Sequence, residues 1–262
     1  MQTEGARKKV VLAIAGHDPT GAAGIQADIE SIAAAGCQCV SIITALSNQN
    51  TSEFLELIPQ QPENFRNQCR TLLADIKPDA CKIGLIGDLS IAEVITETID
   101  SLIKVPLVFD PVMNAGAGKS LATVELQEYI VRELLNRAFV LTPNYNEARQ
   151  LTGNNDIYGA GEQLVVAGCP YVLITGADEH TSEVTNILFY DGGNPEHYKW
   201  ERLTGIYHGS GCTLSSTIAA YLANGTDPVT AIEAAQEYTW KSLKHGQQFG
   251  RRQVHPDRFH GN

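Results

Sequence analysis

A Gly-Ser-Gly-Cys turn precedes a strongly apolar segment in the last quarter of the chain. Gly209, Ser210 and Gly211 would expose successive backbone N–H groups at the start of a helix, which suits a developing negative charge. Cys212 would follow in the positive end of the helix dipole, where the pKa of a thiol falls. A free cysteine in a helix is more often a small buried hydrophobe. The turn therefore predicts an anion-binding site, with Cys212 either a reactive thiol beside it or a packing residue.

Two further segments offer oxygen ligands. Asn144 and Glu147 are three residues apart, so they would project to the same side of one helical turn. This arrangement suits Mg²⁺, which keeps several of its waters, but Asn at an N-cap with Glu three residues later is also typical of a capping box. Asp110 follows an apolar run and precedes a Gly-rich loop that carries Lys119, a combination that could serve a metal–phosphate group. A turn or a helix N-cap explains Asp110 nearly as well.

Two segments nearer the amino terminus could bind a small ligand. The small residues from Gly16 to Gly24 would let a ligand approach the backbone closely, and their glycine spacing matches neither a Walker A loop nor the dinucleotide-binding fingerprint. Asp28 follows on the first turns of the next helix, where a surface acid is the simpler interpretation. Gln49 lies in a short polar run, and its amide, which both donates and accepts, suits the edge of a nitrogen heterocycle. An ordinary polar loop would look the same.

The elements that must position these residues alternate along the whole chain. Short apolar runs predict strands at residues 9–15, 39–45, 80–85, 106–109, 138–141 and 171–174. Longer amphipathic segments predict helices at 24–35, 62–74, 91–103, 124–136, 144–151, 158–167, 211–223 and 228–245. Continuous Val, Ile and Leu runs are typical of strands buried on both faces. We therefore expect an α/β fold, a doubly wound and mainly parallel sheet with helices on both faces.

The organisation of the chain is otherwise uniform. Residues 185–203 break the alternation and predict two strands around a turn at 191–194. Because there is no linker, repeat or shift in composition, we expect a single domain over 1–262, with a flexible segment at 1–8. The polar and Gly-rich segments follow predicted strands, which is where open α/β sheets bind ligands.

Composition narrows the class of protein. The 262 residues include 19 Lys and Arg against 30 Asp and Glu, a net charge of −11, which argues against a general binder of nucleic acid or anionic membranes. None of the six cysteines forms a Cys-x-x-Cys pair, and no apolar run reaches the ~20 residues of a membrane span. Scattered thiols and a polar amino terminus predict a cytoplasmic protein. The assembly state is left open, with a homodimer as one alternative.

Taken together, several motifs resemble one family. They are Ala-Ile-Ala-Gly-His-Asp-Pro at 13–19, Gly-Ile-Gln-Ala-Asp at 24–28, Lys-Ile-Gly at 82–84, Asp-Pro-Val-Met at 110–113, Thr-Pro-Asn at 142–144 and His-Gly-Ser-Gly-Cys-Thr-Leu at 208–214. In this order, over residues 9–259, they resemble the hydroxymethylpyrimidine/phosphomethylpyrimidine kinases of thiamine biosynthesis. The resemblance implies a ribokinase-like fold and transfer of phosphate from ATP, with Mg²⁺, to a pyrimidine hydroxymethyl group and then to its monophosphate.

The resemblance also implies roles for individual residues. Gly16, Asp28, Gln49 and Leu85 would line the pyrimidine pocket, with Gln49 reading the ring. The resemblance implies that Asn144 and Glu147 help to hold Mg²⁺ and phosphate, and Asp110 is expected to serve the same nucleotide–phosphate group. The backbone of residues 209–211 would form the anion hole, and Cys212 would stand where most ribokinase-like enzymes place an Asp base. One departure is residues 175–178, which replace a Lys-Gly-Gly-His-like element and so lack a cationic phosphate contact.

Two rival functions remain. A pyridoxal or pyridoxine kinase shares the fold and, in one branch, the cysteine; Gln49 favours an aminopyrimidine over a hydroxypyridine. A non-catalytic binding or regulatory protein is disfavoured because Cys212, the glycine turn and the Asn144/Glu147 pair are all present.

Overall fold

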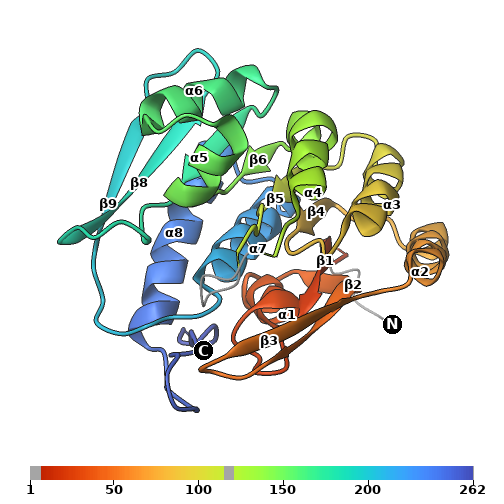
Figure 1. Ribbon diagram of the computed structural model, residues 1–262, viewed down its shortest axis with the longest axis horizontal. Helices are drawn as coiled ribbons and strands as arrows, with labels where there is room; N and C mark the ends of the chain where they lie inside the picture. The colour runs from red at the N-terminus through yellow and green to blue at the C-terminus, as the bar shows by residue number, and fades with distance from the viewer. Residues whose placement is uncertain (1–6, 115–120, 262) are drawn as a thin grey trace.

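Nine strands form one sheet in the computed structural model, which describes residues 7–114 and 121–261 (Figure 1). The strands are β1 (Val10–His17), β2 (Gln38–Gln49), β3 (Phe54–Pro59), β4 (Ala80–Ile83), β5 (Leu107–Phe109), β6 (Val140–Leu141), β7 (Tyr171–Ile174), β8 (Glu183–Tyr190) and β9 (Glu196–Glu201). Their order is β3-β2-β1-β4-β5-β6-β7-β8-β9. The six central strands, which are β2, β1, β4, β5, β6 and β7, pair in parallel. Strand β3 at one edge and strands β8 and β9 at the other pair in antiparallel fashion.

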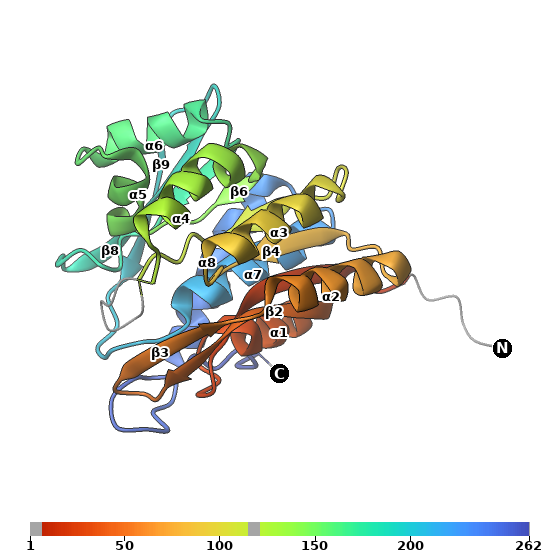
Figure 2. The same ribbon diagram turned by 45° about the vertical axis from the view of Figure 1, so that its right-hand side comes forward.

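Helices cover both faces of the sheet (Figures 1 and 2). On one face lie α2 (Pro62–Asp75), α3 (Leu89–Asp100), α4 (Val124–Tyr129), α5 (Tyr145–Thr152) and α6 (Ile157–Val166). On the other lie α1 (Gly24–Ala34), α7 (Ser210–Ala223) and α8 (Pro228–Lys244). Alternate residues of β1 enter the two cores: Leu12 and Ile14 enter the first, and Val11 and Ala13 enter the second. The strand therefore has to be apolar throughout.

The predicted fold class is confirmed, with local differences. Residues 183–201 form the expected hairpin, β8 and β9. The predicted helix at 124–136 is continued after α4 by a π-helical turn over Ile130–Leu134 and a 3-10 turn over Leu135–Arg137. Strand β3 was not predicted, because it is a half-exposed edge strand without the continuous apolar run that marked the central strands.

The carboxyl-terminal tail after α8 returns beside the β2–β3 hairpin (Figure 2). The backbone N–H groups of Arg251 and Gln253 donate to Thr51, and Val254 bridges to Tyr207. Of the segment expected to be flexible, residues 1–6 lie outside the described part of the chain. No helix among the described residues is long and apolar enough to cross a membrane.

Candidate active site

Two adjoining cavities open at the carboxyl end of the parallel strands. Cavity A, of about 290 Å³, is lined by ten of the residues singled out above: Gly16, Gln49, Leu85, Asp110, Asn144, Glu147, Gly209, Ser210, Gly211 and Cys212. Cavity B, of about 260 Å³, lies among β8, β9 and α8. The two cavities share Thr175, Ala177, Tyr207, Ser210 and Gly211. The amino terminus of α7 therefore stands at the junction between two binding spaces.

The end of cavity A next to β1 and β2 is narrow. A Cβ atom at Gly16 would lie 2.8 Å from Leu85 Cδ2, so a larger residue there would displace the Leu85 side chain. Gln49 ends β2, is half-buried, and lines the same space with Phe54. A flat ring inserted here would meet aliphatic and aromatic carbon together with one side-chain amide.

The amino terminus of α7 has the geometry of an anion site. Gly209 is the N-cap, with φ of 88°, and no side chain among the described residues caps the helix. A Cβ atom at Gly209 would fall 1.8 Å from the carbonyl oxygen of Ala22, so the backbone is pressed against the loop after β1. Both the left-handed conformation and the close approach require glycine at this position. Ser210 and Gly211, the first residues of α7, line the junction of the two cavities.

The environment of Cys212 differs from the sequence expectation. Helix position alone predicts a lowered pKa, but burial, with the carboxylates of Asp28 and Asp110, raises the pKa of the thiol to about 12. Lys82 and a backbone hydrogen bond from Gly24 oppose this shift without reversing it. The free protein therefore holds Cys212 as a neutral thiol at pH 7. The helix dipole is outweighed by desolvation and by two nearby negative groups.

Asp28 does not line cavity A, which corrects its expected place in the pyrimidine pocket. Its side chain is 0% exposed, and Oδ1 accepts hydrogen bonds from Lys82 Nζ at 2.8 Å and from Ser216 Oγ at 2.7 Å. Lys82 is likewise 0% exposed. Burial acts to lower the pKa of the Lys82 ammonium, but the carboxylate of Asp28 holds that pKa above its ordinary value. Asp28 is a buried residue of α1 that forms an ion pair with Lys82 of β4, and both charges act on Cys212.

Asn144 and Glu147 form a capping box at the start of α5. Asn144 Oδ1 accepts the N–H of Glu147 at 2.8 Å, and Glu147 Oε2 accepts the N–H of Asn144 at 2.9 Å. The other carboxylate oxygen, Oε1, accepts the N–H of Met113 at 3.3 Å. The capping box that the sequence suggested as the alternative to a metal site is therefore present. They nevertheless line cavity A, so the helix cap forms part of its wall.

The described lining of cavity A carries acidic side chains but no lysine or arginine. Burial raises the pKa of Asp110 to about 6, and burial together with Asp110 raises the pKa of Glu147 to about 8. Residues 115–120, which include Lys119, lie outside the described part of the chain. In that part no three His, Cys, Asp or Glu side chains are arranged to hold a metal ion.

Cavity B was missed from the sequence. Its walls include Trp200 and Trp240, whose ring centroids are 6.3 Å apart at an interplanar angle of 30°. Trp200 Nε1 donates to Gln236 Oε1 at 3.3 Å, and Trp240 Nε1 donates to the Glu201 carbonyl at 3.0 Å. The polar edges of both rings are therefore occupied. The chain has two tryptophans in all, and their convergence could have been suspected only from knowing that β9 and α8 adjoin.

Asp18 and His208 were also not assigned a role, although both lie in quoted motifs. Their side chains meet at 3.1 Å, between Asp18 Oδ2 and His208 Nε2. Asp18 further accepts the backbone N–H groups of Thr20 and Ala23 at 2.9 and 3.0 Å. Burial acts to raise the pKa of Asp18, but these bonds and His208 lower it below its ordinary value. The pair fixes the loop after β1 against the segment that leads into α7.

Comparison with known proteins decides the family. A family model described as phosphomethylpyrimidine kinase matches residues 18–257. The chain belongs to this family. A hydroxymethylpyrimidine/phosphomethylpyrimidine kinase of Aquifex aeolicus is 31% identical over 248 residues, which cover 92% of this chain and 97% of that protein. The corresponding Rhizobium meliloti kinase is 34% identical, over 87% of this chain and 88% of that protein.

Longer relatives and solved structures extend the comparison. The probable thiamine biosynthetic bifunctional enzyme of Oryza sativa, chloroplastic, is 34% identical, and the chain spans 44% of its length. The chain spans 48% of the length of the thiamine biosynthetic bifunctional enzyme of Arabidopsis thaliana. The phosphomethylpyrimidine kinase structure from Clostridium difficile 630 matches with a TM-score of 0.79 and 33% identity, over 88% of this chain and 98% of that one. The Staphylococcus aureus pyridoxal kinase in complex with pyridoxal matches with a TM-score of 0.89 and 28% identity, over 98% and 95%.

Proposed function

We propose that the protein transfers the terminal phosphoryl group of ATP to the hydroxymethyl group of 4-amino-5-hydroxymethyl-2-methylpyrimidine, and then phosphorylates the resulting monophosphate. The single observation that carries this proposal is the meeting of cavities A and B at the uncapped amino terminus of α7. A phosphoryl group passing from a donor in one cavity to an acceptor in the other would cross these N–H groups. Family membership supports kinase chemistry at the junction.

The acceptor binds in cavity A. Gly16 leaves room for a ring, and the amide of Gln49 can both donate to and accept from an aminopyrimidine edge. Leu85 and Phe54 supply apolar contacts to the ring. Asp28, being sealed behind the cavity, acts on the acceptor only through Cys212 and Lys82.

The nucleoside of ATP binds in cavity B. Trp200 and Trp240 line cavity B and offer an aromatic surface for a purine, and their N–H groups are bonded to protein acceptors. The triphosphate would then lead from cavity B toward Ser210 and Gly211, which line both spaces. The neighbouring S. aureus kinase has been solved with AMP-PCP and pyridoxal, which supports a nucleotide beside the acceptor on this fold.

Asp110 and Glu147 would hold the Mg²⁺ that accompanies ATP. Both carboxylates are almost fully buried, and both line cavity A. Each has a raised pKa, which a bound divalent cation would lower. Oxygen ligands with retained waters suit this ion. The lack of lysine or arginine along the described lining of cavity A makes such a cation the natural partner of the phosphates that reach it. When bound, Mg²⁺ would neutralise charge on the transferring phosphoryl group.

The protein's own part in the transfer is positioning and proton handling. The N–H groups of residues 209–211 would stabilise charge on the phosphoryl oxygens. Cys212, on the first turn of α7 and in cavity A, would take the proton of the acceptor hydroxyl. Because burial keeps the free thiol protonated, it must first ionise, and this requirement predicts activity that rises with pH.

A pyridoxal kinase is the second candidate, favoured by one observation. By TM-score the fold lies closer to the S. aureus pyridoxal kinase than to the C. difficile phosphomethylpyrimidine kinase, whereas sequence identity runs the other way. Fold similarity does not choose between two alcohols that would enter the same cavity. The side chains at Gln49 and Leu85 have to decide it.

Two minor proposals concern the setting of the enzyme. Self-association as a homodimer is supported by the edge strand β3, on which Leu55 and Ile58 expose apolar side chains, as does Leu46 on the neighbouring β2. A place in the reducing cytoplasm is supported by six free thiols.

Product analysis tests the function directly. The purified protein is incubated with ATP, Mg²⁺ and the pyrimidine alcohol, and phosphorylated products are separated by mass. Successive appearance of a monophosphate and a diphosphate, formed far more slowly with Cys212→Ala, is the expected result. A monophosphate alone would remove the second step from the proposal, and no phosphorylated pyrimidine would overturn it.

A further inference from the structure

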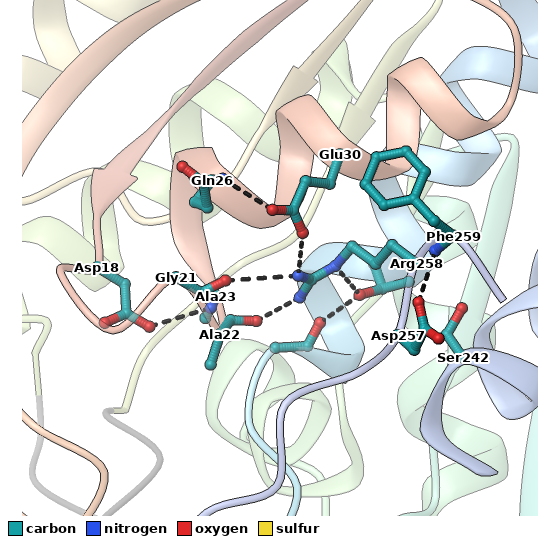
Figure 3. Close-up of polar contacts among 12 residues, drawn as sticks. Asp18, Gly21, Ala22, Ala23, Gln26, Glu30, Ser242, Asp257, Arg258 and Phe259 are labelled. Atoms are coloured by element: carbon teal, nitrogen blue, oxygen red, sulfur yellow. Dashed lines mark hydrogen bonds and ion pairs between the residues drawn. The ribbon is translucent and has the colours of Figure 1, made fainter. Parts of the chain in front are cut away.

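Arg258 is a buried arginine of the carboxyl-terminal tail whose guanidinium reaches the loop after β1 and helix α7 (Figure 3). Nε donates to Thr213 Oγ1 at 3.0 Å, and Nη1 donates to the carbonyl of Gly21 at 3.4 Å. Nη2 donates to the carbonyl of Ala22, and Nη1 also pairs with Glu30 at 2.8 Å. Arg258 is 2% exposed and is not among the residues that line cavity A in the described chain.

These contacts converge on Gly209 from two sides. Thr213 Oγ1, which accepts from Arg258, itself donates to the carbonyl of Gly209 at 2.8 Å. The carbonyl of Ala22, the other acceptor, is the atom against which Gly209 is pressed. Two routes therefore connect the guanidinium to the N-cap of α7: two successive hydrogen bonds through Thr213, and one hydrogen bond followed by a close backbone contact through Ala22.

The backbone of Arg258 is anchored separately, so its side chain works from a fixed point. The carbonyl of Arg258 accepts from the Tyr238 hydroxyl at 2.6 Å, and the N–H of the preceding Asp257 donates to the Ser242 carbonyl at 2.9 Å. Both partners lie on α8. A planar guanidinium with five donors can satisfy acceptors on three segments at once, which an ammonium group with three donors on a flexible stem matches poorly.

We propose that Arg258 is a positioning residue for phosphoryl transfer, which holds Gly209 and the first turn of α7 in the arrangement that receives the phosphoryl group. The proposal rests on the assignment of residues 209–211 as the anion hole. A misplacement of about 1 Å at a reacting centre costs on the order of 100-fold in rate. The alternative is a brace that stabilises the fold and leaves the rate of the chemical step untouched.

The experiment compares four variants of the full chain. Arg258→Met removes the charge and the donors, Arg258→Lys keeps the charge, and Thr213→Val removes the hydroxyl that connects Arg258 to Gly209. Arg252→Met, at an exposed position of the same tail, is the control for loss of one positive charge. Each variant is assayed for kcat and KM, for thermal stability, and for affinity toward ADP with and without aluminium fluoride, a mimic of the transferring phosphoryl group.

Positioning predicts a specific split among these measurements. For Arg258→Met and Thr213→Val, kcat and the affinity for ADP with aluminium fluoride fall by on the order of 10- to 100-fold, while KM and the affinity for ADP alone change less than about threefold. Arg258→Lys recovers part of the loss, Arg252→Met shows none, and the double variant Arg258→Met/Thr213→Val loses less than the sum of the two.

A folded Arg258→Met protein with unchanged kcat and unchanged affinity for ADP with aluminium fluoride would reduce Arg258 to a brace. Additive effects in the double variant would show that Arg258 does not act through Thr213. The aluminium fluoride measurement needs no acceptor alcohol. If the wild type fails to phosphorylate the pyrimidine but the variants still lose this affinity, the substrate assignment fails and the positioning role stands.

Discussion

The ammonium of Lys82 lies 2.8 Å from Oδ1 of Asp28, and neither side chain has exposed surface. Asp28 Oδ1 also receives Ser216, whereas Oδ2 has no hydrogen-bond partner among the described residues. Lys82 comes from β4, Asp28 from α1 and Ser216 from α7, so these three side chains join the sheet to two helices. The charges of Lys82 and Asp28 both act on Cys212. Charge at the base of the site is thus balanced within the protein.

Breaking this pair from one side should be costly. Lys82→Met leaves a buried carboxylate uncompensated, so the free energy of unfolding is expected to fall by about 3–5 kcal/mol. The double variant Asp28→Asn/Lys82→Met removes both charges and should recover most of that loss. Urea denaturation measures both, with Lys241→Met, which breaks the exposed pair with Glu237, as a control expected to change stability by less than about 1 kcal/mol. A loss as small as this for Lys82→Met would contradict the buried pair.

Removal of the thiol tests the proposed base. Cys212→Ala should fold normally and bind ATP, because a small residue at a helix start costs little stability. Turnover should fall by the roughly 10²–10⁴-fold typical of a lost general base. Near-normal turnover in a stable variant would exclude Cys212 from proton transfer.

The raised pKa of Cys212 makes a separate prediction for the free protein. A thiol reacts as its thiolate, which exists above the pKa, so a raised pKa lowers the reactive fraction at pH 7. Alkylation of Cys212 by iodoacetamide should be slow at pH 7 and rise about tenfold per pH unit up to pH 9. The modified residue is identified by peptide mass. A rate already at its plateau by pH 7 would mean a lowered pKa, as helix position alone suggested.

Glu147 combines a cap with a proposed metal ligand, and a matched variant separates the two. Glu147→Gln weakens the capping box, and Asp156→Ala removes the N-cap of α6, so each should cost about 0.5–2 kcal/mol of stability. Only Glu147→Gln should raise the Mg²⁺ concentration needed for half-maximal activity, by about tenfold or more. If the two variants show the same Mg²⁺ dependence, Glu147 is a cap alone.

The sheet, and the gathering of the candidate residues around one cavity, could be predicted because both depend on local pattern. Apolar runs such as residues 9–15 mark strands buried on both faces, and the candidate residues follow such strands. Ten of the expected residues accordingly line cavity A.

What the sequence could not supply were relationships between distant segments. Asp28 finds its partner 54 residues away on β4, so a helix pattern cannot distinguish a pocket residue from a buried ion pair. Trp200 and Trp240 meet only because β9 lies beside α8. The pKa of Cys212 depends on burial and on Asp110, which local helix position does not reveal.

Gln49 should control the choice between the two candidate alcohols. A buried amide left without ring partners costs about 1–3 kcal/mol per group. Gln49→Leu, which removes the amide and keeps most of the bulk, should therefore erase most of the preference for the aminopyrimidine. The ratio of kcat/KM for the pyrimidine alcohol to that for pyridoxine, in wild type and variant, measures this effect. An unchanged ratio would shift discrimination to Leu85 or its neighbours.

The decisive measurement is the same ratio in the wild-type protein, with the two alcohols assayed side by side at fixed ATP and Mg²⁺. We expect 4-amino-5-hydroxymethyl-2-methylpyrimidine to be preferred at least about tenfold in kcat/KM, which corresponds to ~1.4 kcal/mol. Equal or better use of pyridoxine would contradict the pyrimidine assignment and make the protein a vitamin B6 kinase.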